Sequence, residues 1–314
     1  MEVDFLNEMI KTTPILTIGV PTCNREMYIH KCLESIYSQI GNDSRFEVLI
    51  CDNDSSDNTK EIVNIYATKY TNIVYVKNDT NIGASKNIQK VLELATGEYI
   101  HLQGDDDYVQ QGVYYETLNM ISNNRDCDVM FLKFLPSFSA SKVFSVKRGV
   151  GLRNFIVDAN NISGINGILI KNAAYKNIND KEKFLYSSLN HMYIQLEMLH
   201  NNPNYCVLDG PIARFDCASA GFSGYNVMEV IMKNYIDILY SFEGNGLTTA
   251  EIKYQKYFLL FLLLPFIRWV INANMSLSLD NSIELFTEYY SGEAYFEEKL
   301  LELKSILALK ITSR

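Results

Sequence analysis

Apolar and polar positions follow two different periods along the first hundred residues. Four short runs are rich in β-branched and aromatic residues, which favours buried strands. Three segments between them repeat apolar residues every three or four positions, which predicts helices. The predicted strands are residues 15–20, 46–51, 72–77 and 98–103, and the predicted helices are residues 27–39, 57–70 and 84–96. This order predicts βαβ units and an α/β fold with a mostly parallel, Rossmann-like central sheet flanked by helices.

The pattern changes after residue 110. Two segments keep helical spacing, three are extended, and one glycine-punctuated stretch predicts a strand that leads into a helix. The helices are predicted at residues 112–124 and 186–202, the extended segments at 127–135, 142–148 and 205–215, and the glycine-punctuated stretch at 161–175. Residues 225–314 have helical spacing almost throughout. Glycines and small residues cluster at residues 218–224, so we expect one domain over residues 1–220 and a C-terminal helical region over residues 221–314.

The composition is that of a globular protein with an acidic surface. Of the 314 residues, 47% are hydrophobic, which is enough for a sizeable core. The net charge of −9 argues against nucleic acid as the main partner. The six cysteines form no CxxC pair and match no zinc-binding spacing, which favours a reducing compartment. Because the sequence does not open with a basic and then apolar leader, we expect a cytoplasmic protein.

The most apolar run of the chain is "YFLLFLLLPFI", residues 257–267. It is flanked by Lys256 and Arg268 and contains Pro265. A membrane-spanning helix needs about 20 apolar residues, so we do not expect this run to be one. Two interpretations remain, namely a buried helix of the C-terminal region and a surface that docks on a membrane or a partner.

All four predicted strands of the first hundred residues end in polar residues. The strand ends read "PTCNRE", "CDNDSSD", "NDTNIG" and "GDDD". In open parallel sheets, ligands bind outside the carboxyl ends of the strands. The sequence therefore predicts a binding site at this edge.

The last of these strand ends carries Asp105, Asp106 and Asp107 in succession. Adjacent carboxylates raise one another's pKa unless a cation neutralises them. Mg²⁺ or Mn²⁺ does so with oxygen ligands, and such ions are held by one or two carboxylates together with substrate phosphates. The run therefore predicts a metal and diphosphate site. The alternative is a solvated turn or a helix cap, where aspartate is also favoured.

The other strand ends offer further polar groups. Asp52 can accept hydrogen bonds from a base or a ribose, whereas Asp57 is better explained as a helix cap. Lys86 and Asn87 offer donors, although ordinary chemistry at a helix start also explains them. The chain contains no G-x-G-x-x-G, no G-x-x-x-x-G-K-[ST] and no G-x-S-x-G, so dinucleotide, P-loop and hydrolase-triad sites have no support.

Four of these motifs together carry a family resemblance. In order and spacing, "LTIGVPTCNRE", "FEVLICDNDSSDNT", "NIGASKN" and "GEYIHLQGDDD" resemble glycosyltransferase family two. The resemblance covers roughly residues 13–110, and its form is closest to bacterial transferases that build surface polysaccharides. It implies the GT-A fold, a nucleotide-diphosphate sugar donor and a Mn²⁺ or Mg²⁺ cofactor. It also implies an acceptor-side segment from about residue 111.

The resemblance also implies roles for individual residues. Gly104 stands where the common D-x-D motif has its first acid. This departure leaves open which of the three aspartates binds the metal and which contacts the ribose. The implied roles are a nucleotide pocket of Pro21, Thr22 and Arg25, a base contact by Asp52, nucleotide contacts by Lys86 and Asn87, a ribose contact by Asp105, and metal ligation by Asp106 with support from Asp107.

The catalytic base is placed by the same resemblance on the segment after "ISGINGILI". His191 is the first candidate, and Glu182 and Asp180 are alternatives. Ser163 and Gly164 are expected to shape the acceptor side, because glycine lets a ligand approach the backbone. The base would deprotonate an acceptor hydroxyl that attacks the anomeric carbon, with inversion.

The resulting hypothesis is a metal-dependent transferase with a UDP-linked sugar donor and a glycan or lipid-linked acceptor. The C-terminal helices would cover the acceptor groove, contact the inner membrane face peripherally, or form an oligomer. A nucleotidyltransferase is a second hypothesis, but its usual glycine-rich basic loop is missing from "PTCNREMY". A non-catalytic binding protein of the same fold is a third, and metal-dependent nucleotide binding would distinguish it.

Overall fold

The computed structural model describes residues 13–133, 143–160, 162–215 and 225–312. The chain divides into two compact units, the first made of residues 1–185 and 190–219 and the second of residues 186–189 and 220–314. The boundary predicted at residues 218–224 lies outside the described residues.

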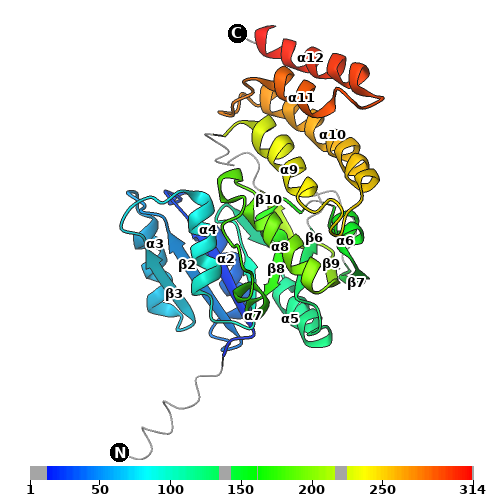
Figure 1. Ribbon diagram of the computed structural model, residues 1–314. Helices are drawn as coiled ribbons and strands as arrows, with labels where there is room; N and C mark the ends of the chain where they lie inside the picture. The colour runs from blue at the N-terminus through cyan, green and yellow to red at the C-terminus, as the bar shows by residue number, and fades with distance from the viewer. Residues whose placement is uncertain (1–12, 134–142, 161, 216–224, 313–314) are drawn as a thin grey trace, which may run out of the picture. The chain divides into compact units, whose positions relative to one another are not determined.

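The first unit is built on an eight-stranded sheet (Figure 1). Its strand order is β3-β2-β1-β4-β8-β6-β9-β7. The strands are β1 (Leu16–Thr22), β2 (Phe46–Asp52), β3 (Ile73–Lys77), β4 (Tyr99–Leu102), β6 (Val129–Lys133), β7 (Ser145–Val150), β8 (Ile168–Lys171) and β9 (Asn204–Asp209). A separate two-stranded sheet pairs β5 (Asp107–Val109) with β10 (Ala213–Phe215).

The predicted parallel arrangement is confirmed for the first four strands of the sheet. β1 pairs in parallel with β2 and with β4, and β2 pairs in parallel with β3. The second half is mixed, because β8 runs antiparallel to both β4 and β6. The regular alternation of strand and helix ends after β4, so the sequence pattern gave no signal for this antiparallel insertion.

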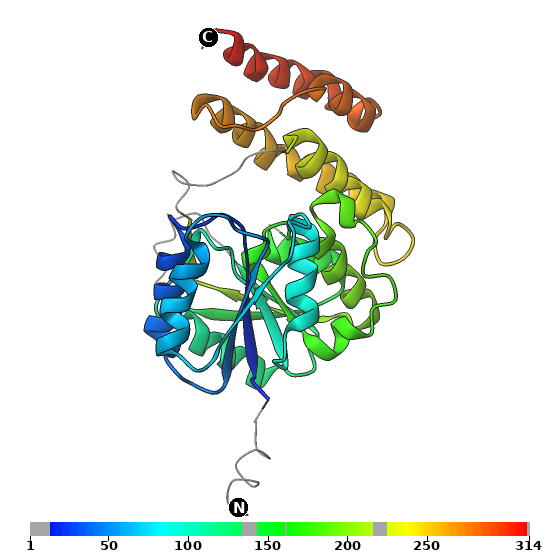
Figure 2. The ribbon, with the colours of Figure 1, turned by 90° about the vertical axis from the view of Figure 1, so that its left-hand side faces the viewer.

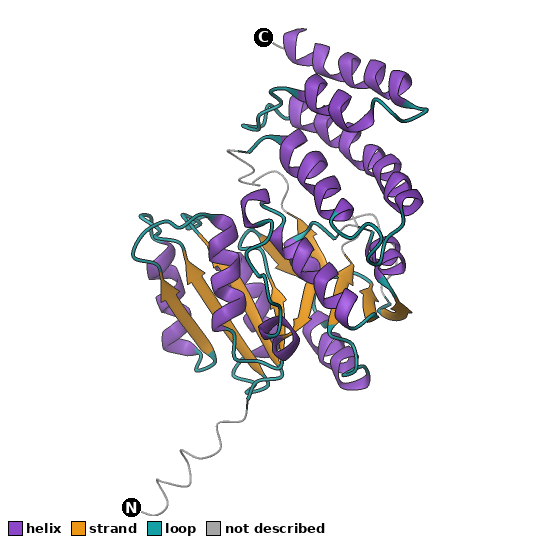
Figure 3. Cartoon of the chain, viewed as in Figure 1, coloured by secondary structure: helices purple, strands orange, loops and turns teal. Residues whose placement is uncertain are grey.

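Helices cover both faces of the sheet (Figures 2 and 3). One face carries α2 (Ile29–Ile40), α3 (Thr59–Lys69) and α5 (Val113–Asn123), and the other carries α4 (Ala84–Leu94), α6 (Leu152–Ala159), α7 (Asn172–Lys176) and α8 (Asn190–Asn201). The short η1 (Ile165–Gly167) and η2 (Leu185–Ser187) are 3-10 turns. The helix predicted at residues 186–202 therefore begins only at Asn190.

The strands place alternate residues on opposite faces, as the pleat requires. In β1, Leu16, Ile18 and Val20 are fully buried in the core cluster that includes α2 and α5. Gly19 faces α4, and a Cβ at this position would lie 2.2 Å from Val91 Cγ1. This glycine therefore lets α4 pack directly on the sheet, with the first turn of the helix above the strand ends.

The second unit is helical, as predicted. It contains the π-helical segment η3 (Met228–Asn234), α9 (Tyr235–Tyr240), α10 (Thr249–Asn272), α11 (Ser282–Tyr290) and α12 (Phe296–Thr312). Its own core is formed by apolar residues of all five elements. A capping box of Thr248 and Glu251 starts α10, which continues through Pro265.

The helix α10 is longer than the apolar run at residues 257–267 that the sequence singles out. The helix has 24 residues and, by length and composition, is long and apolar enough to cross a membrane. Within its most apolar stretch, 44% is buried inside the protein. A core helix of a globular protein has the same properties, so the helix alone does not establish a membrane span.

Candidate functional site

Three loops at the carboxyl edge of the sheet bring most of the candidate residues together. They follow β1, β2 and β4, which are neighbours in the sheet. Arg25, after β1, reaches the loop after β4, and its Nε lies 3.3 Å from Asp105 Oδ1. Thr22, the last residue of β1, is buried, and its hydroxyl lies beside Asp105, where it helps to lower the pKa of that carboxyl against the larger effect of burial.

The loops after β1 and β2 are tied together by several side chains. The Asn24 backbone N–H donates to Ser55 Oγ at 2.8 Å, and the Asn24 side chain accepts from the Ser56 N–H at 2.8 Å. The Glu26 N–H donates to Asp57 Oδ2 at 3.0 Å. Asp57 also accepts from the Thr59 N–H and hydroxyl at the start of α3. Asp57 therefore has a structural role at the start of α3, although the N-cap residue is Asn58 and makes no side-chain cap bond.

Asp52 ends β2 and is completely buried. Its Oδ1 accepts from the Ser55 N–H at 2.8 Å, and its Oδ2 accepts from the Tyr75 hydroxyl at 2.6 Å. Each carboxylate oxygen keeps a second lone pair. In this structure Asp52 mainly fixes the loop after β2, and a base contact would add to these bonds rather than replace them.

Hydrogen bonds among buried asparagine side chains connect the loops at the same edge of the sheet. Asn87, at 2% exposure, donates to the Cys51 carbonyl at 2.8 Å and accepts from Asn78 at 3.1 Å. Asn78 also donates to Asn53 at 3.0 Å. The amide of Asn87 is thus used inside the protein, and a nucleotide contact by Asn87 would have to use its second amide N–H. Lys86, in the first turn of α4, is exposed and available.

The three aspartates do not have equivalent surroundings. Asp105 and Asp107 are 8% and 7% exposed, whereas Asp106 is half-buried. Burial raises the pKa of Asp105 to about 6, with Asp106 adding to the shift and Arg25 opposing it. Burial also raises the pKa of Asp107 to about 7, with a further contribution from Asp106. The cluster therefore favours either a proton or a cation near neutral pH.

Asn166, in η1, holds this cluster, and sequence reasoning missed it. Its side-chain oxygen accepts from the Gly104 N–H, and its side-chain nitrogen donates to Asp107 Oδ2. Its backbone carbonyl accepts from His101 Nε2 at 2.9 Å. A Cβ on Gly104 would lie 2.9 Å from Asn166 Oδ1 and 3.0 Å from Asp107 Oδ2. Asn166 thus occupies the space that a side chain at position 104 would need.

The donor set fits a metal held jointly with a substrate. Among the described residues, no group of three or more His, Cys, Asp and Glu side chains could hold an ion by itself. Asp105 is paired with Arg25, and Asp107 is bonded to Asn166. No hydrogen bond or ion pair engages Asp106 within the described ranges. One available carboxylate next to two buried ones suits Mg²⁺ or Mn²⁺ that takes its other ligands from phosphates and water.

The candidates for the base are placed very differently from one another. His191 is 4% exposed, and its Nε2–H donates to the Ser163 carbonyl at 2.7 Å. Burial lowers the pKa of His191 to about 4. Asp180 accepts from the Lys183 N–H at 3.0 Å, while Glu182 has an exposed side chain. This geometry argues against His191 as the base and gives it a positioning role on the Ser163 backbone.

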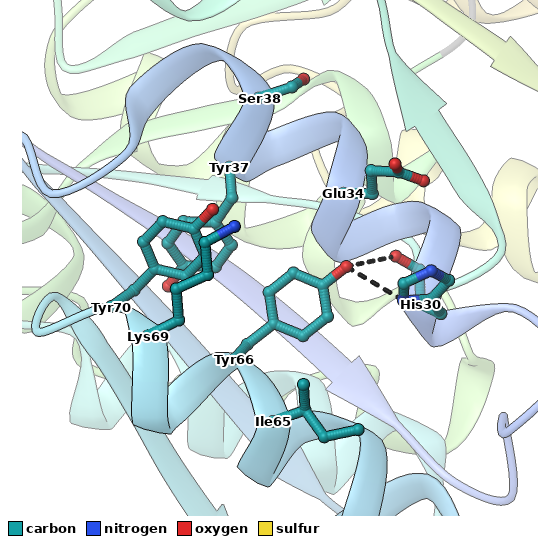
Figure 4. A pocket seen from close by; sticks show the side chains of 8 residues that line it. All are labelled: His30, Glu34, Tyr37, Ser38, Ile65, Tyr66, Lys69 and Tyr70. Atoms are coloured by element: carbon teal, nitrogen blue, oxygen red, sulfur yellow. Dashed lines mark hydrogen bonds between the residues drawn. The ribbon is translucent and has the colours of Figure 1, made fainter.

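A hollow of about 360 Å³ lies between α2 and α3 (Figure 4). It is lined by three tyrosines, and the rings of Tyr37 and Tyr70 stack with their centroids 3.9 Å apart. The Tyr66 hydroxyl contacts His30 Nδ1 at 3.0 Å. None of the candidate site residues lines this hollow, and its ring contacts join the two helices.

Sequence comparison identifies the matching family. The profile described as "Glycosyl transferase family 2" matches residues 17–144. An abequosyltransferase of Salmonella typhimurium is 33% identical over 94 residues, which is 30% of this chain and 28% of that protein. A poly(ribitol-phosphate) beta-glucosyltransferase of Bacillus spizizenii is 30% identical over 113 residues, 35% of this chain and 18% of that protein. The matches cover 41% or less of the length of these and other curated relatives.

Solved structures share the fold over almost the whole chain. TarS of S. aureus, residues 1–349, has a TM-score of 0.62 at 18% identity, covering 95% of this chain and 91% of that one. The same protein has been solved with UDP-GlcNAc. A mannosyltransferase of Pyrobaculum calidifontis, solved with GDP-Man and Mn²⁺, has a TM-score of 0.55 at 13% identity and covers 96% of this chain and 88% of that one.

Proposed function

Because the chain belongs to glycosyltransferase family 2, with the GT-A fold, we propose that it transfers a sugar from a UDP-linked donor to a glycan or lipid-linked acceptor. The proposal assigns the donor to the edge formed by the loops after β1, β2 and β4. The nucleotidyltransferase hypothesis has no matching observation in the site.

One observation carries the proposal. Asp105, Asp106 and Asp107 lie at the carboxyl edge of the sheet, two of them buried and one available, with Arg25 paired to the first. A fold gains no stability from burying adjacent carboxylates, because desolvation and mutual repulsion both oppose it. A site that binds a diphosphate through a cation does require such a cluster.

The donor pocket follows from this arrangement. We assign the base contact to Asp52, the ribose contact to Asp105, and the pocket wall to Pro21, Thr22 and Arg25. The buried Thr22 hydroxyl lies next to Asp105 in this wall. Lys86 lies in the first turn of α4, where the positive end of the helix also favours phosphate oxygens.

The cofactor in this proposal is Mn²⁺ or Mg²⁺. Asp106 would hold it, and Asp107 would support it through the fixed geometry of Asn166. When bound, the ion neutralises the charge that develops on the leaving diphosphate.

The acceptor side is assigned to the segment that contains η1 and the loop before α8. A carboxylate there would take the proton of the acceptor hydroxyl as its oxygen attacks the anomeric carbon from the face opposite the diphosphate, with inversion. We assign this role to Glu182, whose side chain is exposed, with Asp180 as the alternative. His191 would support the Ser163 backbone.

Calorimetric titration with UDP tests the proposal on the full chain, with and without Mn²⁺. Metal-dependent binding that disappears in Asp106→Ala supports it and justifies a screen of UDP-sugars for transfer and hydrolysis. Asp54→Asn is the control, because Asp54 is an acid of the neighbouring loop with an exposed ion pair to Lys77 at 3.7 Å, and asparagine tolerates its positive φ of 65°. If UDP does not bind under any condition, the UDP-linked donor is wrong and other nucleotides are titrated next; if none of them binds, the non-catalytic hypothesis is favoured.

A further inference from the structure

One face of α10 exposes large apolar side chains. Tyr254, Tyr257, Phe261 and Leu262 are exposed to 59%, 37%, 56% and 42%. Tyr254, Tyr257 and Phe261 recur at steps of three and four residues, and Leu262 and the exposed Pro265 lie beside them on the same side of the helix. We call these five residues the α10 face. Contiguous apolar exposure of this kind marks an interaction surface.

The charges around the α10 face are of one sign. The exposed Lys253 and Arg268 stand at its two ends. No Asp or Glu occurs from residue 252 to residue 279, although the whole chain has a net charge of −9. Lys256, the third cation of the helix, is buried and paired with Glu293 at 2.5 Å. The charged side chains exposed along the α10 face are therefore the two cations Lys253 and Arg268, with Glu251 two residues before Lys253 at the start of the helix.

The opposite side of α10 is fixed in the core of the second unit. Leu260, Leu263, Leu264 and Ile267 are at most 3% exposed, and they share this core with residues of α11 and α12. The Tyr290 hydroxyl also donates to the Lys256 carbonyl at 2.9 Å. If α10 crossed a bilayer, this core would have to open. The helix is therefore suited to lie on a membrane rather than to span it.

We propose that the α10 face docks the protein on the surface of an anionic lipid bilayer. Tyrosine and phenylalanine rings suit the boundary between headgroups and acyl chains. Lys253 and Arg268 would meet anionic headgroups, which attract basic side chains close to the surface. The proposal does not depend on the transfer chemistry.

The single tryptophan of the chain, Trp269, allows a direct test. It lies on α10, half-buried, next to Arg268. Vesicles of phosphatidylcholine with phosphatidylglycerol should shift its fluorescence to the blue and should sediment with the full chain. Vesicles of phosphatidylcholine alone should do so much less, and added salt should weaken the binding. If another surface of the protein bound the vesicles, the protein would sediment with them but the Trp269 fluorescence would not shift, which would contradict the proposal.

Variants separate the apolar and the charged contributions. Phe261→Ser with Tyr254→Ser should abolish the shift, and Lys253→Gln and Arg268→Gln should each weaken partitioning about fivefold. The matched controls are Leu301→Ser and Lys304→Gln, exposed residues of α12 that should leave binding unchanged. Circular dichroism melting and metal-dependent UDP binding verify that each variant is folded.

Two results would overturn the proposal. One is wild-type protein that is monomeric by light scattering and binds neither kind of vesicle. The other is a dimer that Phe261→Ser dissociates, which would mean that a second copy covers the face. UDP binding measured without vesicles is unaffected by either result, so a failure here is distinct from a failure of the proposed transferase function.

Discussion

Arg25 and Asp105 are 80 residues apart in the sequence, and Arg25 Nε lies 3.3 Å from Asp105 Oδ1. Arg25 lies in the loop after β1 and Asp105 in the loop after β4. Their ion pair therefore joins two of the loops that form the candidate donor site. The guanidinium opposes the rise in the pKa of Asp105 that burial causes. The pair therefore controls how much of Asp105 is a carboxylate near neutral pH.

We expect Arg25→Ala to weaken metal-dependent UDP binding about tenfold or more, since it removes a charge-assisted contact from a buried acid. Without Arg25 the pKa of Asp105 rises further, so the loss should be largest at slightly acidic pH and should shrink as the pH increases. Calorimetric titrations over a range of pH values measure this. Arg45→Ala is the control, because Arg45 and Asp43 form an exposed pair at 2.6 Å and exposed pairs contribute little. A pH-independent loss would mean that Arg25 acts only on the ligand.

The pKa of Asp107 gives a prediction for the stability of the metal-free protein. Burial raises it from 3.8 to about 7, so between these values the folded state holds a proton that the unfolded state releases. The free energy of unfolding should therefore fall as the pH rises from about 4 to about 7. Asp107→Asn removes this contribution, so its melting temperature should decline less over that range. Asp54→Asn should follow the wild type, and parallel curves for wild type and Asp107→Asn would contradict the prediction.

Asn166 gives the prediction that separates positioning from direct binding. Asn166→Ala leaves the Gly104 N–H and the buried Asp107 carboxyl without their partner, so it should lower stability by about 1–3 kcal/mol. Asn166→Asp keeps the size of the side chain but places a second carboxyl against Asp107, so it should impair Mn²⁺-dependent UDP binding more than Asn166→Ala does. Melting curves and calorimetry measure both effects.

The control for these variants is Asn154→Ala. Asn154 donates to the Val150 carbonyl at 2.9 Å on the surface, so its loss should change neither quantity appreciably. If Asn166→Asp bound UDP and Mn²⁺ like the wild type, the clamp between Asn166 and Asp107 would have no role in the site.

The sequence predicted the parts of the site that depend on local periodicity. Four strands and three helices alternate with clear periods, so the edge that carries Arg25, Asp52 and the three aspartates followed directly. Their order along the chain fixes which loops meet, because parallel strands share one carboxyl edge. This is why most of the candidate donor residues lie together in the structure.

Tertiary contacts decided what the sequence could not predict. Asn166 lies within the glycine-punctuated stretch at residues 161–175 and has no motif of its own, and its role appears only when β8 inserts antiparallel beside β4. Asn87 is also an asparagine and lies at the start of a helix, yet its side-chain amide donates to the Cys51 carbonyl inside the protein. His191 matches an expected position, but α8 buries it. Burial and hydrogen-bond partners, which are nonlocal, separate these three cases.

Gly104 gives the last prediction, which concerns the departure from the common D-x-D motif. An acid at this position is the family's usual form, but a Cβ here would lie 2.9 Å from Asn166 Oδ1 and 3.0 Å from Asp107 Oδ2. Gly104→Asp should therefore destabilise the protein and weaken Mn²⁺-dependent UDP binding, even though it restores the motif. Gly104→Ala should show a smaller destabilisation, because it adds the Cβ without the charge.

Combining Gly104→Asp with Asn166→Gly should recover part of the loss, since the second change vacates the space beside position 104. Melting curves for the wild type, Gly104→Asp, Asn166→Gly and the double variant measure the coupling between the two positions. Additive effects would show that Asn166 and residue 104 do not compete for the same space, and tighter binding by Gly104→Asp alone would show that a third acid can join the site without displacing Asn166.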